Sequence, residues 1–167
     1  GTAIGGSGDY VQVISNHIHD NGGRTQGWAF IPESYGTYLK GRYNLIRTNR
    51  VHGHTGNGIR TGNDPSTSTS ELLVDSIIEN NLVYDNGGSF SHPRGRYGTP
   101  EFRCVVVTGG DGIVVWHGSG NIIRNNVIYD NVGYGIRVAE DTTLSSTPNV
   151  VYNNTVYRSG YTGIYSY

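Results

Sequence analysis

Five segments of the chain share one repeat, which constrains the fold more than any other feature. Each copy carries one asparagine at a fixed place, namely Asn16, Asn49, Asn81, Asn126 and Asn154. An aliphatic residue stands three positions earlier (Val13, Ile46, Ile78, Ile123, Val151) and another two positions later (Ile18, Val51, Val83, Ile128, Val156). The asparagines are 33, 32, 45 and 28 residues apart, as expected for a constant coil with inserted loops of variable length. The repeat predicts a parallel β-solenoid, in which like residues stack in successive coils.

The composition agrees with this prediction. The 167 residues include 26 glycines and 16 asparagines, and valine and isoleucine total 30 against six leucines, which favours strands over helices. The formal net charge of −1 argues against a nucleic acid as partner. No apolar run approaches the ~20 residues of a membrane helix, so we predict no membrane insertion. The single cysteine, Cys104, excludes an intramolecular disulfide.

The asparagine column has a physical explanation at a bend between two sheets. A side-chain amide there can donate a hydrogen bond to one coil and accept one from the next, and asparagine tolerates left-handed backbone. Glycines are expected to supply positive φ at a second bend. These glycines are Gly22, Gly23, Gly87, Gly88, Gly133, Gly135 and Gly163. We therefore interpret the asparagine column as structural.

The clearest copy, NIIRNNVIYDNVGYGI (121–136), and its four counterparts resemble the right-handed parallel β-helix repeats of pectate-lyase-like proteins, alginate lyases, mannuronan epimerases and phage tailspikes. The resemblance implies an all-β, right-handed parallel β-helix of about five coils with inserted loops, forming a single domain over residues 1–167. We recognise no amphipathic cap at either end, so we expect a segment of a longer helix and self-association through uncapped ends. The resemblance also implies an extracellular or cell-surface protein with a polysaccharide as partner.

A second alignment gathers charged residues on one predicted face. An isoleucine stands ten residues after the asparagine in three copies (Ile59, Ile136, Ile164), and Ile113 takes this place in the interrupted copy. One position later stand Arg60, Val114, Arg137 and Tyr165. Stacking would place Arg60 and Arg137 on one face, two coils and roughly 10 Å apart.

This face suggests the chemistry of a lyase acting on an acidic polysaccharide. Such an enzyme must neutralise a sugar carboxylate, remove a neighbouring proton and protonate the leaving oxygen. We expect Arg60 and Arg137 to clamp the carboxylate, His117 or Lys40 to act as base, and Trp116 to contact the sugar. Opposite charges stacked on an exposed sheet would give the same pattern without any ligand.

Two further groups of polar residues are candidates for binding. Arg94, Arg96 and Arg103 lie in the third insertion, and arginine forks suit carboxylate or sulfate groups, although a solvated loop would have the same composition. Asp111, Glu140 and Asp141 supply oxygen ligands of the kind that Ca²⁺ prefers, so Ca²⁺ is the expected cofactor if there is one.

An outward aromatic stripe is predicted three positions after each asparagine. Its members are His19, His52, Tyr84, Tyr129 and Tyr157. Tyr84 and Tyr129 are candidates for stacking on sugar rings, but cross-strand aromatic stacking stabilises any sheet without a ligand. His17 and His54 flank the first two members, and four converging imidazoles would suit a transition metal.

Two functions follow from these patterns. The first is an extracellular carbohydrate-active β-helix, lyase-like on an acidic polysaccharide, and the arginine-rich face favours it. The second is a non-catalytic structural or glycan-binding solenoid segment, as in a tailspike, adhesin or surface-fibre module. The abundant tyrosines and the absence of the paired-aspartate arrangement of polygalacturonases favour the second.

Overall fold

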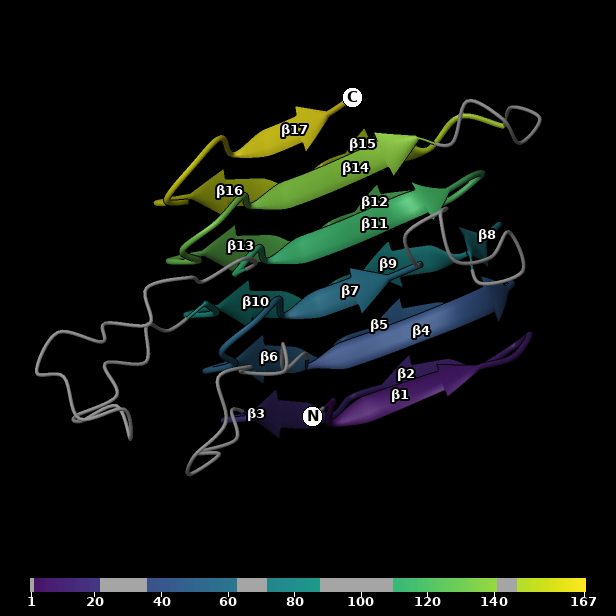
Figure 1. Cartoon of the computed structure of the whole chain (residues 1–167), viewed down its shortest axis with the longest axis horizontal. Coiled ribbons are helices and arrows are strands. Elements are labelled where there is room, and N and C mark those ends of the chain that lie inside the picture. The colour runs from purple at the N-terminus through teal and green to yellow at the C-terminus, as the bar shows by residue number, and fades with distance from the viewer. Residues whose placement is uncertain (1, 22–35, 63–71, 88–109, 141–146) are drawn as a thin grey trace, which may run out of the picture.

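The computed structural model describes residues 2–21, 36–62, 72–87, 110–140 and 147–167, and all of its regular elements in these ranges are β-strands. The strands form three parallel sheets, with successive coils stacked from the N-terminus to the C-terminus (Figure 1). This arrangement confirms the predicted all-β parallel solenoid.

Each complete coil contributes one strand to each sheet. Sheet A contains β1 (Ile4–Ser7), β4 (Thr37–Arg42), β7 (Ile59–Thr61), β11 (Ile113–Gly118), β14 (Ile136–Glu140) and β17 (Ile164–Ser166), with β8 (Leu73–Val74) paired to β4. Sheet B contains β2 (Gln12–Ile14), β5 (Leu45–Arg47), β9 (Ile77–Glu79), β12 (Ile122–Arg124) and β15 (Val150–Tyr152). Sheet C contains β3 (His17–His19), β6 (Arg50–His52), β10 (Leu82–Tyr84), β13 (Val127–Tyr129) and β16 (Thr155–Tyr157).

The aliphatic columns of the repeat form the core. On sheet B the register pairs Ile46 with Ile78 and Ile78 with Ile123, and on sheet C it pairs Val51 with Val83. All of these side chains are buried, as are Ile59, Ile113 and Ile136 of sheet A. Thr37 occupies the corresponding place in the second coil, where it is also buried. Stacking of like residues confirms the predicted columns.

The asparagine column forms a continuous hydrogen-bonded ladder between sheets B and C. The Asn81 Oδ1 accepts from the backbone N of Asn49 (2.9 Å) and from its Nδ2 (3.0 Å), and Asn126 and Asn154 repeat the pattern. Each Nδ2 also donates to a backbone carbonyl, as from Asn81 to Ile46 (3.0 Å). The predicted structural role of these asparagines is confirmed.

Two further ladders, not predicted from the sequence, lie five residues to either side of the first. Between sheets A and B the acceptors are Asn44, Ser76, Asn121 and Asn149. After sheet C they are His54, Asn86 and Asn131. Every corner of the described coils is thus held by side chains that satisfy backbone groups of the neighbouring coil.

The left-handed backbone lies at a different residue from the one predicted. The residue immediately before each asparagine of the predicted column has positive φ, as at Thr48 (56°), Asn80 (56°) and Asn125 (55°), whereas these column asparagines do not. Gly87 has positive φ (91°), as predicted, but Gly133, Gly135 and Gly163 do not. A Cβ on Gly135 would collide with Val156, so this glycine permits close approach rather than a turn. Gly22, Gly23 and Gly88 lie outside the described residues.

A buried carboxylate on sheet B shows how charges are accommodated across coils. Glu79 accepts from the Nε of Arg47 and from the Nε of Arg124, each at 2.6 Å, and its side chain is 5% exposed. Burial raises the pKa of Glu79, but the hydrogen bonds from Arg124 and Arg47 outweigh it and hold the pKa below its usual value. This arginine–glutamate–arginine stack is saturated by its own partners, so we interpret it as structural.

Candidate functional site

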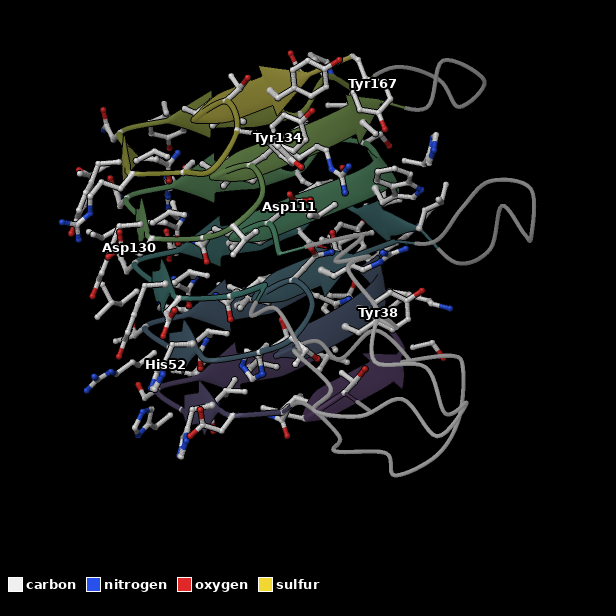
Figure 2. The ribbon with its side chains drawn as sticks, turned by 60° about the vertical axis from the view of Figure 1, so that its left-hand side comes forward. Tyr38, His52, Asp111, Asp130, Tyr134 and Tyr167 are labelled. Atoms are coloured by element: carbon white, nitrogen blue, oxygen red, sulfur yellow. The ribbon has the colours of Figure 1, made fainter. Side chains whose placement is uncertain are left out.

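The outer face of sheet A brings the predicted arginines together. The register stacks Tyr38, Arg60, Val114, Arg137 and Tyr165 in one outward column. Arg60 and Arg137 are therefore two coils apart on the same face, as the sequence predicted. In Figure 2, Tyr38 and Tyr167 of this face lie on the right of the molecule, and His52 of sheet C and Asp130, which follows β13, lie on the left.

Trp116 connects the two arginines. The guanidinium carbon of Arg137 lies 4.7 Å from the centre of the Trp116 ring, and that of Arg60 lies 5.8 Å from it. The Arg60 guanidinium also lies 5.9 Å from the ring of Tyr38, and the Lys40 ammonium lies 5.0 Å from the same ring. A cation over an aromatic face is attracted to the ring, and this attraction orders its side chain. We call Lys40, Arg60, Trp116 and Arg137, with Tyr38, the cation–aromatic face.

Asp111 fixes the position of Arg137. Its Oδ2 lies 2.7 Å from the Arg137 Nη2, and its Oδ1 accepts a hydrogen bond from the backbone N of Tyr134 (2.8 Å). The backbone N of Asp111 donates to the Oδ1 of Asn57 (3.0 Å), which ties the bend to the preceding coil. The Asp111 side chain is 3% exposed and that of Arg137 is 20% exposed, so this ion pair is poorly solvated. A guanidinium held in this way is oriented before any ligand arrives.

Two buried donors near this ion pair remain unused within the described part of the chain. The Nε of Arg137 and the indole Nε1 of Trp116 have no hydrogen-bond acceptor there. Buried N–H groups without acceptors are uncommon in folded proteins. These two N–H groups on the Arg137 side of sheet A could therefore donate hydrogen bonds to a ligand.

His117 has an unusual backbone conformation within a strand. It has φ 52° and lies at an irregularity of β11, where the pairing with β14 shifts between Trp116 and Gly118. The other non-glycine residues with positive φ lie outside the strands, whereas His117 lies within one. Its ring meets the ring of Trp116 edge to face, with centroids 5.5 Å apart. Bulges commonly redirect a side chain beside a functional site, and this one directs the imidazole toward Trp116.

The aromatic stripe on sheet C is confirmed as a continuous stack. Tyr84 lies between His52 (4.6 Å between ring centroids) and Tyr129 (4.9 Å), and Tyr129 lies between Tyr84 and Tyr157 (4.9 Å). The rings are nearly parallel, with interplanar angles of 14°, 2° and 6°. Both faces of Tyr84 and Tyr129 are covered by neighbouring rings, so these tyrosines offer a sugar only their edges and hydroxyl groups.

The remaining predicted ligands are only partly described. Arg94, Arg96, Arg103 and Asp141 lie outside the described residues, as does the side chain of Glu140, whose backbone pairs with Gly118. Among the residues that the structure describes, no three His, Cys, Asp or Glu side chains are grouped to hold a metal ion. Because Asp111 is engaged by Arg137, a Ca²⁺ ion at this edge would depend on Glu140 and Asp141.

Two residues of the face were not identified as site residues from the sequence. The repeat does not predict Tyr38, because the residue before it is Thr37, which takes the place of the isoleucine found in the other coils. The packing of Tyr134 against Arg137 (5.5 Å from the guanidinium to the ring centre) depends on the bend at Asp111, which the repeat does not specify. A search that allowed threonine in the aliphatic column would have found Tyr38.

Comparison with protein families supports the predicted right-handed coil in the C-terminal part of the chain. Residues 96–167 match the family model described as a right handed beta helix region. The chain is a right-handed parallel β-helix. No curated protein and no solved structure matches this β-helix. Within its described residues, the β-helix contains no helix long and apolar enough to cross a membrane.

Proposed function

We propose that the protein is an extracellular carbohydrate-active β-helix that binds an acidic polysaccharide across the cation–aromatic face and cleaves it as a lyase. One observation carries the proposal: Arg60 and Arg137 converge on the same indole from coils two apart. Arginine forks bind carboxylates in a directional, bidentate manner. Aromatic side chains beside them supply the apolar surface that a sugar ring needs.

The proposed reaction is a β-elimination on a uronate residue. His117 removes the C5 proton, and the charge that develops on the adjacent carboxylate is stabilised by Arg137 and Arg60. The electron pair forms the C4–C5 double bond as the C4–O bond to the neighbouring sugar breaks. The leaving oxygen takes a proton from a second acid or from water. Lys40 is the alternative base, but His117 contacts Trp116, the ring on which Arg137 stacks, whereas Lys40 lies over Tyr38.

Removing either arginine should weaken the interaction with an acidic glycan. We expect Arg60→Ala and Arg137→Ala to lower affinity for polygalacturonate or alginate at least about tenfold, or about 1.4 kcal/mol. Arg158→Ala is the matched control, because Arg158 forms its ion pair with Asp130 on the opposite side of the molecule. Binding is measured by titration. Turnover is measured, with and without Ca²⁺, by the ultraviolet absorbance of the unsaturated product. Circular dichroism checks that each variant is folded.

The outcomes separate the two candidate functions. Product formation that both arginine variants lose supports the lyase. Binding without product supports the second candidate, a non-catalytic glycan-binding solenoid segment, which the close ion pairing of Arg137 with Asp111 favours. Self-association through the ends of the solenoid belongs to this second proposal and is read by light scattering. Equal binding by wild type, both arginine variants and Arg158→Ala would refute a role for this face.

The conformation of His117 gives an independent test of its proposed role. A non-glycine residue with φ 52° is strained, so His117→Gly should raise the free energy of unfolding by about 1 kcal/mol. Thr48→Gly is the control, because exposed Thr48 has φ 56° at a bend and should show a similar gain. The prediction is that only His117→Gly loses product formation. A fully active His117→Gly protein would remove this residue from the mechanism.

A further inference from the structure

Three histidines gather on the outer face of sheet C in the first two coils, away from the cation–aromatic face. His17 and His19 alternate outward along β3 while Ile18 points into the core. His52 on β6 stands directly opposite His19 in the register. Their ring centroids are 4.4 Å apart (His17–His19), 5.1 Å (His17–His52) and 5.4 Å (His19–His52). The predicted fourth member, His54, is instead buried in a ladder.

The ring nitrogens of His17 and His52 have the spacing of a chelate. The Nε2 of His17 lies 2.8 Å from the Nε2 of His52. Two nitrogens bound at about 2.0–2.1 Å to one metal are about 2.9 Å apart in cis positions of a square-planar or octahedral ion, and about 3.3 Å apart around a tetrahedral ion. The observed separation matches the cis arrangement, which Cu²⁺ and Ni²⁺ prefer, better than the tetrahedral arrangement of Zn²⁺.

His19 is prepared to serve as a third ligand. Its Nδ1 lies 2.9 Å from the Oδ2 of Asp20, so a proton on Nδ1 is shared with the carboxylate and the lone pair is left on Nε2. A carboxylate behind a ligating histidine fixes its tautomer and increases its basicity. The Asp20 charge also balances that of Arg50, which stands opposite His17 and contacts the Tyr84 hydroxyl.

A direct contact holds His17 and His52 together. In the absence of metal, one Nε2–H donates to the other Nε2, and this hydrogen bond holds the two rings at chelating distance.

We propose that His17 and His52 form a surface site for a divalent transition metal, Cu²⁺ or Ni²⁺ in preference to Zn²⁺, with His19 as a third ligand. No three side chains of the described residues already surround a common point, so water completes the coordination of the two Nε2 atoms until His19 rotates in. The site consists of imidazole nitrogen donors with one carboxylate behind them and therefore does not suit Ca²⁺ or Mg²⁺, which prefer oxygen ligands. It is independent of the proposed glycan site.

The site is tested by titrating the whole protein with CuCl₂, NiCl₂ and ZnCl₂ by calorimetry. We expect one site, with affinity falling from Cu²⁺ through Ni²⁺ to Zn²⁺. His17→Gln and His52→Gln should each weaken Ni²⁺ binding at least about tenfold, and His19→Gln several-fold. His117→Gln is the matched control, because this histidine lies on sheet A and should leave metal binding unchanged.

A spectroscopic readout distinguishes coordination from general surface binding. The electron paramagnetic resonance spectrum of the Cu²⁺-loaded protein should show coupling to imidazole nitrogens, which the His17→Gln and His52→Gln double variant loses while keeping its circular dichroism. Unchanged Cu²⁺ coupling or affinity in that double variant would overturn the proposal. Tighter binding of Zn²⁺ than of Ni²⁺ would overturn the cis geometry.

Discussion

Asn81→Ala is expected to lower the free energy of unfolding by about 3–5 kcal/mol. The substitution removes four buried hydrogen bonds and leaves polar groups of the neighbouring coils without a partner. The Asn81 Oδ1 accepts from the backbone N and the Nδ2 of Asn49. Its Nδ2 donates to the carbonyl of Ile46 and to the Oδ1 of Asn126. Asn81 is 1% exposed, so water cannot replace these partners without opening the coil.

Asn16→Ala is the matched control for this prediction. Asn16 belongs to the same column but is exposed, and its amide donates to Ile14 and Asn49 without accepting a hydrogen bond from another described coil. Its loss should cost about 1 kcal/mol. Urea unfolding followed by circular dichroism measures both. Equal destabilisation by the two substitutions would show that the ladder does not act cooperatively along the solenoid.

The core and one ladder could be predicted from the sequence because the same type of residue recurs in them at a fixed place in each coil. Val13, Ile46 and their counterparts recur in every coil, and stacking requires only that like residues meet. The other two ladders escaped prediction because Ser76 and His54 interrupt their asparagines. Each of these residues supplies an acceptor in a different chemical form. The identity of the residue changes along these columns while its hydrogen-bonding role does not.

The candidate site was predictable only as far as strand register determines it. Arg60 and Arg137 share a face because they share a column. The ion pair between Asp111 and Arg137 depends on the path of the bend before β11, which the repeat does not specify. The stripe of Tyr84 and Tyr129 was predicted correctly, but the covering of its ring faces depends on side-chain rotation at each coil. The repeat therefore predicts on which face a side chain lies, whereas packing determines which of its atoms a ligand can contact.

His54 is expected to make stability depend on pH. Its Nδ1 accepts from the backbone N of Asn21 (3.2 Å), and its Nε2 lies 3.3 Å from the carbonyl of Ile18, so the neutral ring reproduces the acceptor and donor of a ladder amide. If Nδ1 were protonated, its N–H would face the backbone N–H of Asn21, and neither donor would have an acceptor. Burial, the largest cause, lowers the pKa of His54 from 6.5 to about 4. Between these values the unfolded chain binds a proton that the folded chain does not, so stability falls as pH falls.

The loss attributable to His54 should reach about 3 kcal/mol between pH 6.5 and pH 4, since each pKa unit corresponds to about 1.4 kcal/mol. His54→Asn restores the residue found at the equivalent positions Asn86 and Asn131. We expect the variant to fold and to lack this part of the pH dependence. Urea unfolding of both proteins at several pH values measures the difference in stability. Both proteins contain the same carboxylates, so the contribution of these groups to the pH dependence cancels. If the two proteins lost stability in parallel over this range, His54 would not be the group that titrates. The ladder would then accept a charged imidazole, contrary to the requirement that each buried donor meets an acceptor.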